Sequence, residues 1–234
     1  MNSIQFARRS CSAALAAALT IAISLPVQAA GKRADMDGVW ILLRAEIGKL
    51  QLTPAGEKLR AAYDFQKDDP DFQCKPASIT RIMHTPSPPI EVRQHRDDVE
   101  VNYEFMDVRR RVPLKAGLAA KDAPYAVRQH PHLGKSVAHY EGETLVVETV
   151  GQRAGIMDTL GVPGLYQSDQ IRTVEKFIPD GDKMQIVVTH DDPVYLTQTL
   201  TVTFSYLRLP GGKIMKWDCK PEEATFERFT KPQK

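Results

Sequence analysis

The sequence predicts an all-β protein with one short N-terminal helix, built as an antiparallel meander that closes into a barrel. Two observations predict this fold class. After residue 90 the chain consists of short segments with alternating apolar residues, and tight turns separate most of them. A meander of about seven to nine strands leaves exposed edges unless it closes into a barrel or folds into a sandwich. We favour an up-and-down barrel.

Residues 134–151 carry the clearest strand signal. If Gly142 and Glu143 form the loop of a hairpin, Tyr140 pairs with Leu145, and Ala138 pairs with Val147. This apolar face is expected to point into the core.

The remaining elements follow from similar patterns. A first strand is expected near 37–43. Thr53 and Pro54 fit the N-cap and first position of a helix that runs to about Phe65. Further strands are expected at 90–94, 99–105, 109–114, 171–177, 184–190, 197–209 and 214–219. The threonine-rich face of 197–205 is expected to be the outer one.

The N-terminal residues resemble a secretory signal. Arg8 and Arg9 precede an apolar run at 13–24, which is too short for a permanent membrane span, and residues 27–29 fit a cleavage site. We therefore expect a signal peptide at 1–29 and a single domain at 30–234, located in the periplasm or secreted. Twin-arginine export and an N-terminal anchor are the alternatives. No second apolar stretch is long enough to span a membrane.

Charge and cysteine usage narrow the function classes. Removal of residues 1–29 takes Arg8 and Arg9 from the 31 basic residues, which leaves 29 against 29 acidic residues. A neutral chain does not favour nucleic acid as a partner. In an oxidising compartment Cys74 and Cys219 are expected to form a disulfide, with two separate buried thiols as the alternative. No His or Cys beside either one has zinc-ligand spacing.

The motifs together resemble a family of secreted bacterial proteins found in soil and aquatic bacteria. They are Asp37–Trp40, Leu52–Gly56, Cys74–Pro76 with Arg81, Gly134–Val137, Tyr140–Thr149, Val174–Phe177, Thr189–Pro193 and Cys219. The chain departs from the family pattern at Tyr140, Glu143, Glu148, Gln167 and Lys176. The resemblance implies a β-rich domain similar to a lipocalin or calycin, and it specifies no reaction.

Three readings of function remain open. The first is a small-molecule-binding barrel for an apolar or aromatic ligand, without a cofactor. Its expected ligand-binding residues are Tyr103, Phe105, Tyr140, His190, Phe204 and Trp217. The second is a cofactor-independent lyase, hydratase or isomerase, with His139 as base, Glu148 as its orienting carboxylate and Arg109 as an electrophilic clamp. The third is a structural envelope protein.

Other polar groups also have two readings each. His190, Asp191 and Asp192 can hold a divalent ion or simply cap the turn before Pro193. His130 and His132 can share a metal or lie in a solvated loop. Arg109, Arg110 and Arg111 can bind an anion or form a solvated basic strand. On a strand Arg110 faces opposite to the other two, so one inward arginine near Glu104 or Glu175 would be notable.

Overall fold

The computed structural model describes residues 33–84, 88–157 and 162–221. These residues belong to one compact unit. The predicted signal peptide at 1–29 lies outside the described residues. Among the helices of the described part, none has the length and apolar character needed to cross a membrane.

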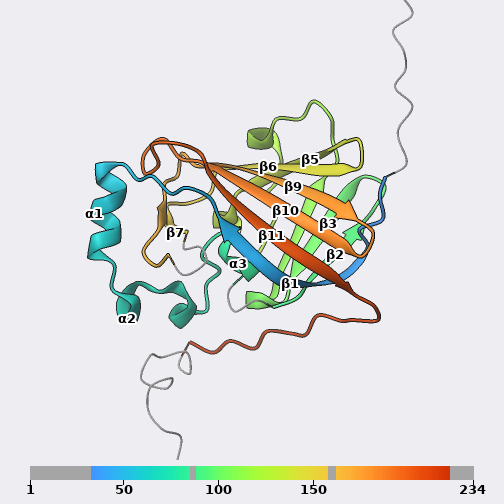
Figure 1. The fold of residues 1–234 in the computed structure, drawn as a ribbon, viewed down its shortest axis with the longest axis horizontal. Coiled ribbons are helices and arrows are strands. Elements are labelled where there is room, and N and C mark those ends of the chain that lie inside the picture. Colours follow the sequence, from blue (N-terminus) through green and yellow to red (C-terminus); the bar gives the residue numbers. More distant parts are fainter. Residues whose placement is uncertain (1–32, 85–87, 158–161, 222–234) are drawn as a thin grey trace, which may run out of the picture. The chain divides into compact units, whose positions relative to one another are not determined.

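The described residues form a nine-stranded antiparallel sheet that curls into a nearly closed barrel (Figure 1). The strand order is β4-β3-β2-β1-β11-β10-β9-β6-β5. The strands are β1 (Gly38–Ile47), β2 (Ile90–Gln94), β3 (Asp98–Tyr103), β4 (Val108–Pro113), β5 (Lys135–Glu141), β6 (Thr144–Val150), β9 (Arg172–Asp180), β10 (Lys183–Asp191) and β11 (Leu200–Leu209). A separate two-stranded ribbon joins β7 (Gly155–Ile156) to β8 (Tyr166–Gln167). The predicted all-β barrel is confirmed.

Side-chain alternation decides which residues fill the barrel. On β11 Leu200, Val202, Phe204 and Tyr206 are all buried, while the intervening threonines are half-buried, as the pattern predicted. The hairpin of β5 and β6 has the predicted register, with Tyr140 opposite Leu145. The inward residues of β11 and of the β5–β6 hairpin belong to the same apolar core.

The barrel closes at a seam between β4 and β5 rather than through a continuous ladder. Leu114 forms one parallel bridge with Ala138. Next to it a short stretch of the connecting chain bridges the two strands, because the Arg111 amide donates to the Ala126 carbonyl and the Ala126 amide donates to the Gly134 carbonyl. Elsewhere in the described sheet the neighbouring strands pair directly, so the seam is the part of the wall that lacks a continuous ladder.

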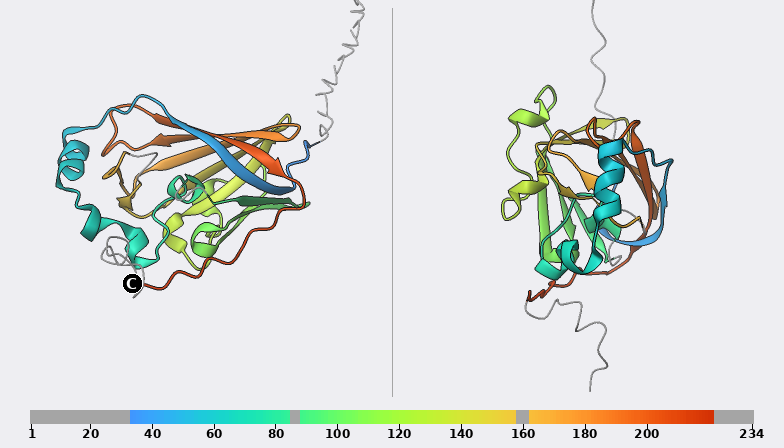
Figure 2. Two further views of the ribbon diagram at one scale, coloured as in Figure 1. Left: turned by 60° about the horizontal axis from the view of Figure 1, so that its bottom comes forward. Right: turned by 90° about the vertical axis from the view of Figure 1, so that its left-hand side faces the viewer.

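Short helices lie at one end of the barrel. The predicted helix is α1 (Pro54–Ala62), and the Thr53 hydroxyl caps it by accepting from the Gly56 amide at 3.2 Å. It crosses the barrel end in Figure 2. Two further α-helices, α2 (Phe65–Asp68) and α3 (Arg81–His84), follow it. The 3-10 turns are η1 (Pro70–Gln73), η2 (Phe105–Asp107), η3 (Ala120–Asp122) and η4 (Pro131–Leu133).

The segment that leads into α3 packs inside the barrel end. Ile79, Thr80, Ile82 and Met83 are all almost fully buried. The Tyr206 hydroxyl of β11 donates to the Met83 carbonyl at 3.0 Å, which fixes the segment against the sheet. This segment therefore plugs the end of the barrel that α1 crosses.

Two predicted strands differ from the structure. The strand expected at 99–105 ends at Tyr103, because Glu104 has helical backbone angles (φ −62°, ψ −44°), after which Met106 and Asp107, with φ angles of 55° and 52°, turn the chain. The strand expected at 214–219 is an extended strap without ladder partners (Figure 1). The Met215 amide of this strap donates to the Glu104 carboxylate at 2.7 Å, so a side chain holds it where a neighbouring strand was expected.

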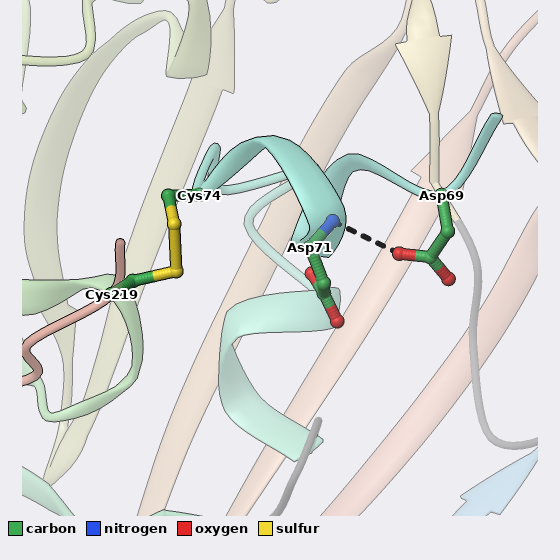
Figure 3. The surroundings of a disulfide bond; sticks show 4 residues. All are labelled: Asp69, Asp71, Cys74 and Cys219. Carbon is green, nitrogen blue, oxygen red and sulfur yellow. Dashed lines mark hydrogen bonds between the residues drawn. A yellow bond between two sulfur atoms is a disulfide. The ribbon is translucent and has the colours of Figure 1, made fainter. Parts of the chain in front are cut away.

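The predicted disulfide is confirmed. Cys74 and Cys219 are bonded, with their Cα atoms 5.7 Å apart (Figure 3). Beside it Asp69 caps η1 through the Asp71 amide at 2.9 Å. Asp69 and Asp71 also bind the buried guanidinium of Arg81 at 3.0 and 2.7 Å. The disulfide thus anchors the C-terminal strap to the loop that precedes the plug segment.

Candidate functional site

A pair of opposite charges lies inside the apolar barrel. The side chains of Arg110 on β4 and Glu175 on β9 are both 0% exposed. Arg110 donates two parallel hydrogen bonds to the two carboxylate oxygens of Glu175, at 2.8 and 2.6 Å. Burial alone lowers the pKa of Arg110, but the charge of Glu175 outweighs it and raises this pKa above its usual value. Arg110 is therefore a permanent buried cation.

Three hydroxyl groups complete this interior cluster. Arg110 also donates to Ser136 on β5 at 3.1 Å and to Thr149 on β6 at 2.9 Å. It contacts the Tyr103 hydroxyl at 3.5 Å. Burial raises the pKa of Tyr103 well above its usual range, so its hydroxyl stays protonated. The cluster is electrically neutral as a whole.

One donor of the interior cluster is unused. The Nε atom of Arg110 is buried and has no hydrogen-bond partner among the described residues. Such groups are rare in folded proteins because an unpaired buried N–H has lost its bonds to water. The unused donor marks a place where a further acceptor would fit chemically.

A second set of buried polar side chains, centred on His190, lies next to the Arg110–Glu175 cluster along β9. His190 on β10 pairs with Thr173, two residues from Glu175. The His190 ring contacts Thr80 of the plug segment at 2.6 Å and Thr173 at 3.4 Å, while Gln152 donates to Thr173 at 2.9 Å. Burial lowers the pKa of His190 to about 4, against a smaller opposing effect of Asp192. His190 is therefore neutral at physiological pH.

The predicted alternatives at His190, Asp191 and Asp192 can now be compared. Asp191 is exposed and His190 points into the barrel, because neighbouring strand residues face opposite ways. The Asp192 carboxylate accepts from the Ser168 amide and hydroxyl at 2.6 and 2.8 Å and from the Val194 amide at 3.0 Å. The three side chains do not converge, and Asp192 caps the turn that contains Pro193 and joins it to Ser168.

The predicted catalytic residues lie on the outer surface. His139 is half-exposed and contacts Glu141 at 3.4 Å, while Glu148 binds Arg172 at 2.8 Å. The expectation that His139 and Glu148 form an acid–base pair inside the barrel is therefore wrong. The reason is strand alternation: Ser136, Ala138 and Tyr140 take the inner face of β5, which leaves His139 outside.

Arg109 is also placed outside the barrel. It binds Asp107 at 2.6 Å and the Tyr103 carbonyl at 2.9 Å, so it secures the turn between β3 and β4. The inward arginine is Arg110. Arg109 and Arg111 face opposite to Arg110, as strand alternation predicts, so Arg109 does not reach the barrel interior as the expected electrophilic clamp.

The predicted ligand-binding aromatics occupy two places. Tyr103 and Phe204 are fully buried in the barrel, and Tyr140 is half-buried with its hydroxyl accepting from Gln94 at 2.8 Å. Trp217 of the strap packs edge-on against Phe105, with ring centroids 5.0 Å apart. Trp217 therefore covers Phe105 from the strap, and the other three belong to the barrel core.

Three open hollows lined by described residues lie on the outer side of the barrel. One, of about 360 Å³, lies over the outer face of β2, β3 and β4 and is lined by Glu91, Arg93, Glu100, Asn102, Arg109, Arg110, Arg111 and Ile214. A second, of about 420 Å³, follows the outer side of the seam near Tyr125 and Arg128. A third lies by the turns around Asp182. The inward-facing apolar side chains of the described strands form one buried cluster.

His130 and His132, which were considered as ligands of a shared metal, contact each other and the backbone. His130 and His132 pack ring against ring, 5.7 Å apart, and His132 Nε2 lies 3.0 Å from the Pro76 carbonyl. Within the described residues His95, Asp98 and Glu100 place ligand atoms within 4.8 Å of one another on the β2–β3 hairpin. Arg111 already binds Asp98 there at 2.6 Å, which weakens the case for a cation.

Sequence reasoning missed most of the interior cluster. Ser136, Thr149 and Thr173 read as ordinary strand residues, and Thr80 lies outside any predicted element. A signal did exist for Arg110, because the strand residues two positions before and after it, Val108 and Val112, are apolar; for Glu175 the signal was weaker, because only Phe177 on one side is apolar. A charged residue at a strand position flanked by apolar residues indicates either that this face of the strand is exposed or that the charge has a buried partner.

Comparison with known proteins adds little. No family model matches the sequence, and no curated protein matches it. Among solved structures, the chain is similar to the wild-type fluorescent protein UnaG, with 16% identity over 74% of this chain and 97% of that chain and a TM-score of 0.36. It is also similar to apo lipid binding protein 8 of Caenorhabditis elegans, with 9% identity, 74% and 94% coverage and a TM-score of 0.35. Likenesses at this level carry no functional argument.

Proposed function

We propose that the protein is exported and that its barrel binds a small, largely apolar molecule at the interior cluster. The observation that carries this proposal is the fully buried Arg110–Glu175 pair with its unused Arg110 Nε. Two buried charges lose their hydration, and well-packed apolar residues often stabilise a fold as much or more. A pair retained at that cost, with a donor left open, supports a role in recognition.

The composition of the core supports access by a ligand. The core includes five methionines, namely Met36, Met83, Met106, Met157 and Met184. Methionine side chains are unbranched and adaptable, and they can repack around an apolar guest. An interior of this kind can open a cavity at lower cost than one built from branched or aromatic residues alone.

Export is supported by two independent features. The residues at 1–29 have the order of a signal peptide, with basic residues before a short apolar run. The Cys74–Cys219 disulfide fits an oxidising compartment. We propose the periplasm or the extracellular space as the location, in line with the resemblance to secreted bacterial proteins.

The residues assigned to a lyase, hydratase or isomerase do not support that function. His139, Glu148 and Arg109 point away from the barrel interior, and the buried His190 contacts threonines. A histidine with a pKa near 4 is a weak general base at neutral pH. The alternative that the experiment must distinguish from ligand binding is a purely structural role in the cell envelope.

The test is native mass spectrometry of the protein purified from a bacterial periplasm. We expect a retained small molecule that organic solvent releases. The double variant Arg110→Met/Glu175→Leu should lose it. The matched control is Lys176→Met/Glu141→Leu, which removes an ion pair of 3.1 Å from the outer surface next to Glu175.

Two results would count against binding. A protein without any retained molecule, whose melting temperature no compound of an apolar library raises, would leave the structural reading. Retention that is equal in the interior double variant and in the wild type would place the ligand elsewhere. Circular dichroism confirms that each variant is folded before it is compared.

A further inference from the structure

We propose that the ligand is electrically neutral and that one of its oxygen atoms, from a carbonyl, ether or alcohol, accepts a hydrogen bond from Arg110 Nε. This inference rests on the proposed binding function and names the ligand class. It follows from the charge balance of the interior cluster and from its unused hydrogen-bonding capacity.

The charge balance disfavours an anionic ligand. Both Arg110 and Glu175 are 0% exposed, and the bidentate contact already neutralises the guanidinium. A ligand carboxylate would place two anions against one cation in a medium of low dielectric, where like charges repel strongly. Arg81, the other arginine that is almost fully buried among the described residues, is held by Asp69 and Asp71.

The donors of the cluster call for an acceptor. A guanidinium offers five N–H donors and no acceptor. Arg110 uses its terminal nitrogens for Glu175, Ser136, Thr149 and Tyr103, and its Nε remains buried without a partner among the described residues. Only an acceptor atom can satisfy it. A neutral oxygen does so without disturbing the charge balance.

A second donor points to the same chemistry. The Tyr103 hydroxyl accepts from Arg110 at 3.5 Å, which leaves its own proton to donate. Burial keeps that hydroxyl protonated. Phe177 on β9 and Val147 on β6 flank the cluster with apolar surface and are both fully buried. The cluster therefore combines donors with an apolar lining, which suits a ketone, ester, ether or alcohol with a hydrocarbon body.

The role of Glu175 in this picture is selectivity. Its carboxylate occupies the place that a ligand anion would need on Arg110. Neutralising Glu175 should leave the Arg110 charge uncompensated and make the interior attractive to carboxylates. The preference of the barrel for neutral over anionic ligands is thus expected to shrink markedly with one substitution.

Three probes of one size separate these effects. They are 2-acetylnaphthalene, a neutral ketone; 2-ethylnaphthalene, which lacks the oxygen; and 2-naphthoate, which is anionic. At pH 8 we expect the ketone to bind the full-length mature protein about tenfold more tightly than 2-ethylnaphthalene and about a hundredfold more tightly than 2-naphthoate, measured as Kd by calorimetry. Glu175→Gln should tighten 2-naphthoate at least about tenfold.

The matched control is Glu141→Gln, which neutralises a carboxylate on the outer surface. It should leave all three Kd values unchanged. If Glu175→Gln does not fold, Arg110→Met/Glu175→Leu serves instead, and it should abolish the difference between the ketone and 2-ethylnaphthalene because the donor is gone.

The outcomes distinguish this inference from the proposed function. Binding of 2-naphthoate to the wild type as tightly as the ketone overturns the neutral-ligand inference and leaves the binding function in place. Equal Kd values for the ketone and 2-ethylnaphthalene overturn the hydrogen bond. If no probe binds, the molecule retained in native mass spectrometry decides: a carboxylate or phosphate overturns the inference, a neutral oxygen compound supports it, and no retained molecule overturns the function itself.

Discussion

Arg110 and Glu175 are 65 residues apart in the chain, yet their side chains form two hydrogen bonds inside the barrel. Arg110 lies on β4, at one end of the strand order, and Glu175 lies on β9, two strands from the other end. The pair therefore crosses the seam between β4 and β5. Ser136 of β5 joins it at 3.1 Å, so the interior cluster holds together the part of the wall where strands do not pair directly.

Removing one member of this pair should destabilise the protein far more than removing both. Arg110→Met or Glu175→Leu alone leaves an uncompensated buried charge and should lower the free energy of unfolding by about 3–5 kcal/mol. The double variant should recover most of that loss, because it leaves no charge behind. Urea unfolding at pH 7 measures all four proteins. Additive losses in the double variant would contradict the coupling.

His190 should make the stability depend on pH. In the folded protein burial lowers the pKa of His190 from 6.5 to about 4, so the unfolded chain binds its proton first as the pH falls. Stability is then complete above pH 6.5 and is lost progressively between pH 6.5 and 4, by about 3 kcal/mol in total.

Substitution of His190 isolates this contribution. His190→Gln should flatten the unfolding free energy between pH 6.5 and 4, while the exposed His139→Gln should leave the wild-type curve unchanged. Chemical unfolding at several pH values gives both curves. An equal slope in wild type and His190→Gln would show that other groups control the acid sensitivity.

Thr53 should stabilise the start of α1 and its attachment to the barrel. Its hydroxyl accepts from the Gly56 amide at 3.2 Å and donates to the Val194 carbonyl at 2.7 Å. Thr53→Ala removes both bonds and should lower the free energy of unfolding by about 1–2 kcal/mol. Thr53→Ser keeps the hydroxyl and should lose much less. Equal losses would indicate that the methyl group matters rather than the cap.

The disulfide should contribute strongly to stability. Cys74 and Cys219 are separated by 145 residues, and the chain-entropy model assigns a loop of this length about 5 kcal/mol as an upper figure. Reduction should lower the melting temperature and change the electrophoretic mobility. The control is Cys74→Ser/Cys219→Ser, in which the reducing agent should change neither property.

The sequence predicted the sheet well wherever alternation was regular. The register of the β5–β6 hairpin followed from Tyr140, Leu145 and the loop at Gly142, because a two-residue turn fixes every pair behind it. The N-cap at Thr53 and the disulfide also followed from local chemistry and from compartment. These features depend on few neighbours, so a single sequence was enough.

The candidate site could not be predicted in the same way, because both faces of a strand near the seam carry polar and apolar residues. His139 shares the outer face of β5 with Val137, which is buried there by Ala120 and Ala123. Alternation alone therefore did not show which face pointed inward. The choice between Arg109 and Arg110 depended on Glu175, a partner that only the closed barrel brings near.

The pairing of β1 with β11 has a consequence for synthesis. β11 supplies the hydrogen-bonding partner of both β1 and β10, and it is the last strand of the barrel to be made. A nascent polypeptide that has not yet extended past Leu209 therefore exposes two unsatisfied edges, which are templates for pairing with other chains. Ribosomal stalling or truncation in β11 should thus yield aggregates, whereas the complete translation product leaves neither edge open.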